Sequence, residues 1–196
     1  MLRADLYGTL PAPRAVVLVH GSNWDASGWA TLAPQFAKRG VPALALDLRG
    51  HGRSTGVTPA YVRGQPWSAV TDVAAAKAAL RRRGADEIAL VGSSLGGYAV
   101  MASSFDGDVE SIAVLSSPVG PLDEPHATRL TGRKLFICAD EDSLGAAPHV
   151  LATYRSAPGP KMLLLVGGTE HSRKMFDASY GPEISAALLE FVCRRE

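Results

Sequence analysis

Short apolar runs alternate with longer helix-like segments along almost the whole chain, and this alternation constrains the fold more than any other feature. Strands that alternate with helices are typical of parallel sheets. Continuous apolar runs suit strands that are covered on both faces. We therefore predict an α/β fold with a mostly parallel central sheet flanked by helices on both faces. The runs predicted as its strands are 15–19, 43–46, 88–91, 112–115, 135–138 and 162–166.

The remaining segments complete this prediction. Residues 2–7 alternate polar and apolar side chains, which favours an antiparallel edge strand. A chain of 196 residues can bury one good core but is short for two, and no repeat or linker divides it. We therefore expect one domain spanning residues 1–196. The predicted helices are 29–39, 68–83, 95–104, 146–155 and 182–194.

Bulk properties narrow the possible partners. A net charge of +1 gives no electrostatic reason to bind nucleic acid or an anionic membrane. No apolar run is long enough to span a membrane, and the first residues lack the apolar core of a signal peptide. We expect a cytoplasmic protein, as a monomer or small homo-oligomer, with Cys138 and Cys193 as buried free thiols.

The segment 88–101, IALVGSSLGGYAVM, places Ser94 on a turn between a strand-like and a helix-like run. It stands at the centre of a G-x-S-x-G pattern formed with Gly92 and Gly96. The turn has neither the Gly-Lys-Ser/Thr ending nor the G-x-G-x-x-G spacing of nucleotide-binding loops. In a nucleophile elbow the turn exposes the central side chain above the sheet, and a Cβ at the flanking positions would clash. Because so short a pattern also arises by chance, the hypothesis requires partners elsewhere.

Those partners are available downstream and upstream of Ser94. His171 lies just past the last predicted strand in a glycine-containing loop. The chain beyond His20 and Gly21 can donate a backbone N–H to a developing oxyanion, because that segment follows the first predicted parallel strand. Asp123 is an outside candidate for the acid. Three other acids follow the predicted strand 135–138, and any one of them could reach the imidazole of His171: Asp140, Glu141 and Asp142.

Five segments in this order resemble the α/β-hydrolase superfamily along nearly the whole chain: VVLVHG (16–21), DLRGHGRS (47–54), VGSSLGGY (91–98), FICADEDS (136–143) and VGGTEHS (166–172). The resemblance implies Ser94 as nucleophile and His171 as base. It implies Asp142 as the triad acid, with Asp140 as the alternative. The N–H groups of Leu95 and Ser22 would form the oxyanion hole.

The same resemblance bears on the other histidines. His20 belongs to the HG motif, where a role in shaping the loop is implied. His51 precedes Ser94 and fits the triad order badly, so we interpret it as a scaffold of its turn. Arg49 and Arg53 flank it and could instead bind an anionic substrate. Surface positions are expected for two further histidines, His126 and His149.

Many relatives insert a helical cap where this chain has only residues 118–133, rich in Pro, Gly and charge. We therefore expect an open site without a cap domain. Trp24 and Trp29 follow the HG motif and are predicted to line the substrate pocket, although packing of the first helix explains them equally well. Tyr98 and Met101, on the helix after Ser94, are expected in the core.

These features predict a serine hydrolase acting on a small-molecule carboxylic ester or related acyl substrate. Histidine can take the serine proton and return it to the leaving group, while the acid fixes its tautomer. No metal or organic cofactor is expected. The alternatives are an acyltransferase or other triad chemistry on this fold, and a non-catalytic small-molecule-binding homologue.

Overall fold

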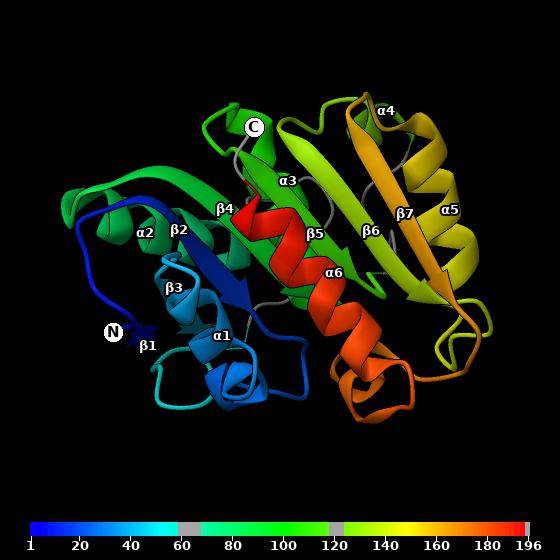
Figure 1. The fold of residues 1–196 in the computed structure, drawn as a ribbon, viewed down its shortest axis with the longest axis horizontal. Helices are drawn as coiled ribbons and strands as arrows, with labels where there is room; N and C mark the ends of the chain where they lie inside the picture. The colour runs from blue at the N-terminus through cyan, green and yellow to red at the C-terminus, as the bar shows by residue number, and fades with distance from the viewer. Residues whose placement is uncertain (59–67, 118–123, 195–196) are drawn as a thin grey trace.

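The computed structural model describes residues 1–58, 68–117 and 124–194, and it contains a seven-stranded sheet (Figure 1). The strand order is β1-β3-β2-β4-β5-β6-β7. All neighbouring pairs are parallel except β1 with β3, which is antiparallel. The predicted sheet and its antiparallel edge strand are both confirmed. The strands are β1 (Arg3–Tyr7), β2 (Ala12–Val19), β3 (Ala43–Asp47), β4 (Ala85–Ser93), β5 (Ser111–Leu115), β6 (Arg133–Ala139) and β7 (Lys161–Val166).

Helices cover both faces of this sheet. In Figure 1, α1 and α6 lie in front of the sheet, and α2, α3 and α5 lie behind it. Alternate residues of β2 enter two separate cores: Val17 and Val19 pack with the second group of helices, and Val16 and Leu18 pack with the first. Burial on both faces is the reason that the central strands read as unbroken apolar runs. The helices are α1 (Ala33–Lys38), α2 (Ser68–Arg82), α3 (Leu95–Ser103), α4 (Glu124–Ala127), α5 (Ala146–Ser156) and α6 (Gly181–Cys193).

The first helix is shorter than the sequence predicts. Residues 26–29 form a 3₁₀ turn, η1 (Ala26–Trp29), and α1 begins only at Ala33. Pro34 stands in its first turn, where the fixed φ of proline is favourable and its missing N–H costs nothing. Upstream, the Asp25 side chain accepts a hydrogen bond from the Ser27 N–H at 2.8 Å. Of the predicted helix 29–39, only residues 33–38 are therefore α-helical, and Trp29 is the last residue of η1.

The connection between β5 and β6 has no room for a cap domain, as predicted. It comprises residues 116–132, of which residues 118–123 lie outside the described part, together with the candidate acid Asp123. The helix that the structure describes in this connection is the single turn α4. Among the described residues, no helix combines the length and apolarity needed to cross a membrane. The described residues thus form a mostly parallel sheet with helices on both faces and no cap domain between β5 and β6.

Candidate active site

The candidate residues gather at the carboxyl ends of the parallel strands. The chain runs from β2 to β3 on one side and resumes at β4 on the other side of β2. The loops that leave β2 and β4 therefore diverge, which opens a crevice at the sheet edge where α/β proteins bind ligands. Ser22 lies in the loop after β2, and Ser94 follows β4 directly.

The turn at Ser94 is tight and strained. Its backbone has φ 49° and ψ −119°, a region that residues with a Cβ rarely adopt. A Cβ placed on Gly92 would lie 2.4 Å from the carbonyl oxygen of Gly96, and one on Gly96 would lie 2.3 Å from that of Val19. The Ser94 N–H donates to the Leu115 carbonyl at 2.9 Å. Both glycines are therefore required by the close approach of β4, α3 and β2.

Hydrogen bonds connect a hydroxyl, an imidazole and a carboxylate at this turn. Nε2 of His171 lies 3.0 Å from Oγ of Ser94, and Nδ1 lies 2.9 Å from both carboxylate oxygens of Asp142. The Asp142 side chain is fully buried, and its Oδ1 also accepts the Leu144 N–H at 3.0 Å. The carboxylate of Asp142 therefore orients the imidazole, and a backbone N–H of the loop after β6 holds that carboxylate in place.

Asp140 and Glu141, the other two acids after β6, are used differently. Asp140 accepts the Gly168 N–H at 3.0 Å, and Glu141 is exposed. The Ser143 N–H donates to the Thr169 carbonyl at 2.8 Å. These bonds join the loop after β6 to the loop after β7. Asp140 thereby helps to position His171, but it is Asp142 whose carboxylate meets the imidazole.

The loop after β2 presents backbone donors beside Ser94. A Cβ on Gly21 would lie 3.2 Å from Cβ of Ser94, so this loop packs directly on the elbow. Ser22 and Ser94 both line a cleft at the carboxyl ends of the strands. Leu95 is the first residue of α3, and the N–H groups of a first helical turn have no acceptor within the helix. The two N–H groups predicted for the oxyanion hole thus belong to adjacent segments.

His20 is part of the scaffold of this loop. Its Nε2 accepts the Leu48 N–H at 3.1 Å, so its single proton resides on Nδ1, which lies 2.7 Å from the Gly21 carbonyl. Burial lowers the pKa of His20, and the nearby His51 adds to this effect. His20 is therefore a neutral donor, which agrees with the loop-shaping role implied by the resemblance.

The two arginines near His51 are occupied by carboxylates. Nε of Arg49 lies 2.9 Å from Oδ1 of the buried Asp72. Arg53 binds Asp5 at 2.8 Å and Asp47 at 3.3 Å. Both therefore brace the turn after β3, as the scaffold interpretation expects, rather than presenting a charge to a substrate.

Two other histidines were expected at the surface. His149 is exposed, whereas His126 is half-buried with its ring stacked on Phe105 at a centroid distance of 6.2 Å. Tyr98 and Met101 lie in the core, as predicted.

A cleft of about 240 Å³ opens over Ser94 and His171. Trp24 lines it and is 38% exposed, whereas Trp29 is not among the lining residues: it is 3% exposed and packs edge-on against Phe176, which is the packing alternative. The 3₁₀ turn that replaces the start of the predicted helix directs its ring into the core. Further lining residues had no sequence signal beyond their position next to the motifs: Asn23, Ser143, Leu144, Ser172 and Lys174.

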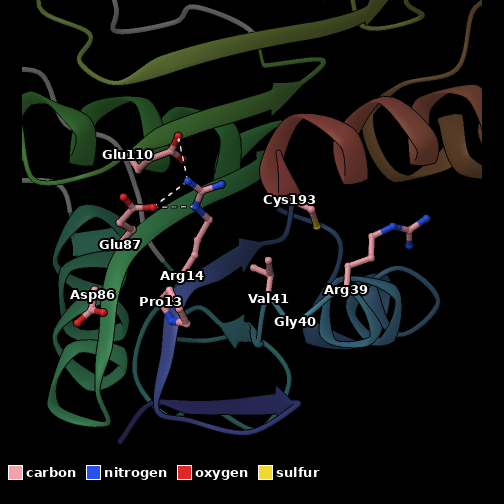
Figure 2. Close-up of a pocket in the computed structure, with 9 residues that line it drawn as sticks. All are labelled: Pro13, Arg14, Arg39, Gly40, Val41, Asp86, Glu87, Glu110 and Cys193. Carbon is pink, nitrogen blue, oxygen red and sulfur yellow. Dashed lines mark hydrogen bonds and ion pairs between the residues drawn. The ribbon is translucent and has the colours of Figure 1, made fainter. Parts of the chain in front are cut away.

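A larger pocket, about 440 Å³, lies at the opposite end of the sheet (Figure 2). Arg14 reaches into it from β2, with Nη2 2.7 Å from Glu87 and 3.7 Å from Glu110. Arg14 also donates to the Val192 carbonyl at 3.0 Å. Its guanidinium is thus committed to internal partners, which argues for a structural role at that end.

Neither cysteine belongs to the candidate site as a nucleophile. Both are free, and Cys138 is fully buried in β6 whereas Cys193 is half-buried. Burial raises the pKa of the Cys138 thiol to about 12, so it is a neutral thiol at physiological pH. Among the described residues, no three His, Cys, Asp or Glu side chains are grouped to hold a metal ion.

Comparisons with known proteins agree with this fold. The model of the alpha/beta hydrolase family matches residues 16–190. The monoacylglycerol lipase of Paleococcus ferrophilus superposes with a TM-score of 0.81 at 16% identity, over 98% of both chains. Est1E from Butyrivibrio proteoclasticus, solved with ferulic acid, gives 0.79 at 17% identity, over 97% of this chain and 93% of that one.

A third structure resembles the chain in lacking a cap. XC6422 from Xanthomonas campestris, described as a serine hydrolase without a lid, gives a TM-score of 0.77 at 17% identity, over 99% of this chain and 88% of that one. No curated protein matches the sequence. At these identities the structural likeness establishes the fold alone.

Proposed function

Because the chain belongs to the alpha/beta hydrolase family, we propose that it is a serine hydrolase that cleaves carboxylic esters through an acyl intermediate on Ser94. The observation that carries this proposal is the hydrogen-bonded chain from Ser94 through His171 to Asp142, with bonds of 3.0 and 2.9 Å. A serine hydroxyl is a weak nucleophile, and an adjacent oriented base is the usual means of activating it.

In the proposed reaction, Oγ of Ser94 attacks the acyl carbon while Nε2 of His171 takes its proton. The carboxylate of Asp142 stabilises the imidazolium that forms and keeps the proton of Nδ1 in place. His171 then protonates the leaving alcohol, which leaves with the electrons of the broken C–O bond. A water molecule, deprotonated by the same imidazole, hydrolyses the acyl-serine.

Negative charge on the acyl oxygen is proposed to be bound by the N–H groups of Leu95 and Ser22. Donors fixed before the reaction stabilise the transition state without reorganisation, and the loss of one costs about 3–4 kcal/mol in known cases. Both groups are backbone donors whose positions depend on the elbow and on the loop after β2. The strained backbone of Ser94 supports this role, since such strain is concentrated at functional turns.

The cleft supports a short acyl or alcohol group. Its volume of about 240 Å³ lies below the roughly 300–1,000 Å³ of sites for drug-sized ligands. Trp24 and the exposed Leu144 supply apolar surface at its rim. We propose small esters in open contact with solvent as the substrate class, with acyl chains shorter than those of lipase substrates.

Hydrolysis of p-nitrophenyl esters of increasing chain length tests this proposal. We expect turnover of the acetate and butyrate esters, with kcat/KM falling for longer acyl chains. Ser94→Ala should lower kcat by roughly 10⁴- to 10⁶-fold, while its unfolding midpoint stays near that of the wild type. Wild-type protein without turnover of any ester, or an active Ser94→Ala variant, would contradict the proposal; the first outcome would favour a non-catalytic binding protein.

A further inference from the structure

Two histidines from separate segments bind consecutive carbonyl groups of the loop after β2. Nδ1 of His20 lies 2.7 Å from the Gly21 carbonyl oxygen, and Nε2 of His51 lies 2.9 Å from the Ser22 carbonyl oxygen. The two carbonyls belong to the peptide units on either side of the Ser22 Cα. The side chains of His20 and His51 therefore hold the two peptide units that flank Ser22, and the first of these units carries the Ser22 N–H.

The first of these units contains the proposed oxyanion donor itself. In a trans peptide the C=O and N–H groups point in opposite directions, so a Gly21 carbonyl held by His20 turns the Ser22 N–H the other way. Rotation of this unit needs little energy, because Gly21 has no Cβ to restrict it. Hydrogen bonds to the Gly21 carbonyl therefore keep the donor in one direction, one from His20 and one from the Trp24 N–H at 3.1 Å.

His51 supplies the second anchor from the turn after β3. Its backbone N–H donates to the Leu48 carbonyl at 3.0 Å, and its Nδ1 lies 3.1 Å from the Arg49 carbonyl oxygen. The same turn is braced by Asp47, whose buried carboxylate also accepts the Ala26 N–H of η1 at 2.7 Å. The imidazole of His51 thus stands on a rigid base and bridges from it to the loop.

The two imidazoles have different hydrogen-bonding environments. His20 has one donor and one acceptor as neighbours and is satisfied as a neutral ring. Both ring nitrogens of His51 face carbonyl oxygens, which accept only. The rings are in contact, with centroids 4.9 Å apart. A neutral His51 ring can donate to only one of its two carbonyl neighbours, and the shorter separation, 2.9 Å to Ser22 against 3.1 Å to Arg49, favours the proton on Nε2.

We propose that His51 is a positioning residue of the oxyanion hole. Its Nε2–H holds the Ser22 carbonyl, so that the Ser22 N–H stays directed at the acyl oxygen of the substrate. The proposal rests on the function proposed above. His51 is outside the described lining of the cleft and acts on the reaction only through Ser22.

Two amide substitutions distinguish a role of His51 at Ser22 from a role within its own turn. The amide nitrogen of glutamine reaches about as far as Nε2 of histidine, and that of asparagine about as far as Nδ1. His51→Gln should keep the bond to Ser22, and His51→Asn should keep only the bond to Arg49. With p-nitrophenyl acetate we expect His51→Asn to lower kcat about tenfold, less than the roughly 10²- to 10³-fold loss of a deleted donor. KM should change less than about twofold.

Rescue by the longer amide is the decisive readout. His51→Gln should stay within about threefold of wild-type kcat, and His149→Asn, on the exposed face of α5, should equal the wild type. If His51 only braced its own turn, His51→Asn would be the better variant. An active wild type with kcat of His51→Asn equal to or above that of His51→Gln, or a loss confined to KM, overturns the proposal for His51 alone. A wild type without turnover overturns the proposed function and this proposal together.

Discussion

The two ends of the sheet differ in how their polar groups are used. At the amino ends of the strands, the larger pocket is crossed by Arg14, whose guanidinium binds Glu87, Glu110 and backbone carbonyls (Figure 2). At the carboxyl ends, the smaller cleft is lined by Ser94, whose hydroxyl lies 3.0 Å from Nε2 of His171, and by Ser22 of the loop after β2. Pocket size alone would favour the amino ends, whereas a hydroxyl beside an oriented imidazole is the reason that we propose the active site at the carboxyl ends.

The largest expected difference lies between two aspartates at the reactive end. Asp142→Asn should lower kcat by roughly 10⁴-fold, because an amide no longer holds the tautomer that the base requires. Asp140→Asn removes one bond to the loop after β7 and should cost less than about tenfold. Steady-state kinetics on one ester compares the two variants. A larger loss in Asp140→Asn would transfer the role of acid to Asp140.

Substitution of Arg14 at the amino ends of the strands should lower the free energy of unfolding and leave kcat unchanged. Arg14→Ala removes the hydrogen bonds to Glu87 and to the Val192 carbonyl, while Glu110 keeps its ion pair with Arg133, and we expect the free energy of unfolding to fall by about 1–3 kcal/mol. Chemical denaturation measures this change. Arg39→Ala, an exposed residue of the same pocket, is the control and should stay within about 0.5 kcal/mol. A marked fall in kcat for folded Arg14→Ala would contradict the purely structural role of Arg14.

A smaller effect should appear on acidification. Burial lowers the pKa of His20 in the folded state, so the unfolded chain binds a proton first as pH falls. The stability due to neutral His20 is complete above its unfolded pKa of about 6.5 and decreases as pH falls through the window below it. Unfolding measured from pH 7.5 to 5 should show a slope of up to about 1.4 kcal/mol per pH unit from this group. His20→Asn should flatten that slope, and His149→Asn should leave it unchanged.

Much of this arrangement follows from sequence because it rests on strong local signals. The apolar runs predict strands that are covered on both faces. Gly92 and Gly96 indicate a tight turn at Ser94, because a Cβ at either flanking position would clash. The order of Ser94, the acids and His171 along the chain then brings them to one edge of a parallel sheet. The roles of the residues near the elbow were carried over from the family resemblance and not from local pattern.

What the sequence did not predict depends on contacts between distant loops. The bond from His51 to Ser22 joins residues 29 positions apart, and its existence depends on the exact path of two turns. For a similar reason the sequence left open whether Trp29 lines the pocket or packs in the core, since its burial depends on the 3₁₀ turn η1. Such features arise from backbone geometry that no spacing of residue types records.

The most direct test of the account is the position of covalent labelling by a fluorophosphonate. We expect about one equivalent of label on the peptide that contains Ser94, lost in Ser94→Ala and in denatured protein, and retained in Ser93→Ala. This result would place an activated hydroxyl at the elbow between β4 and α3. An esterase-active wild type that carries its label on any other residue, or that carries none, would contradict it.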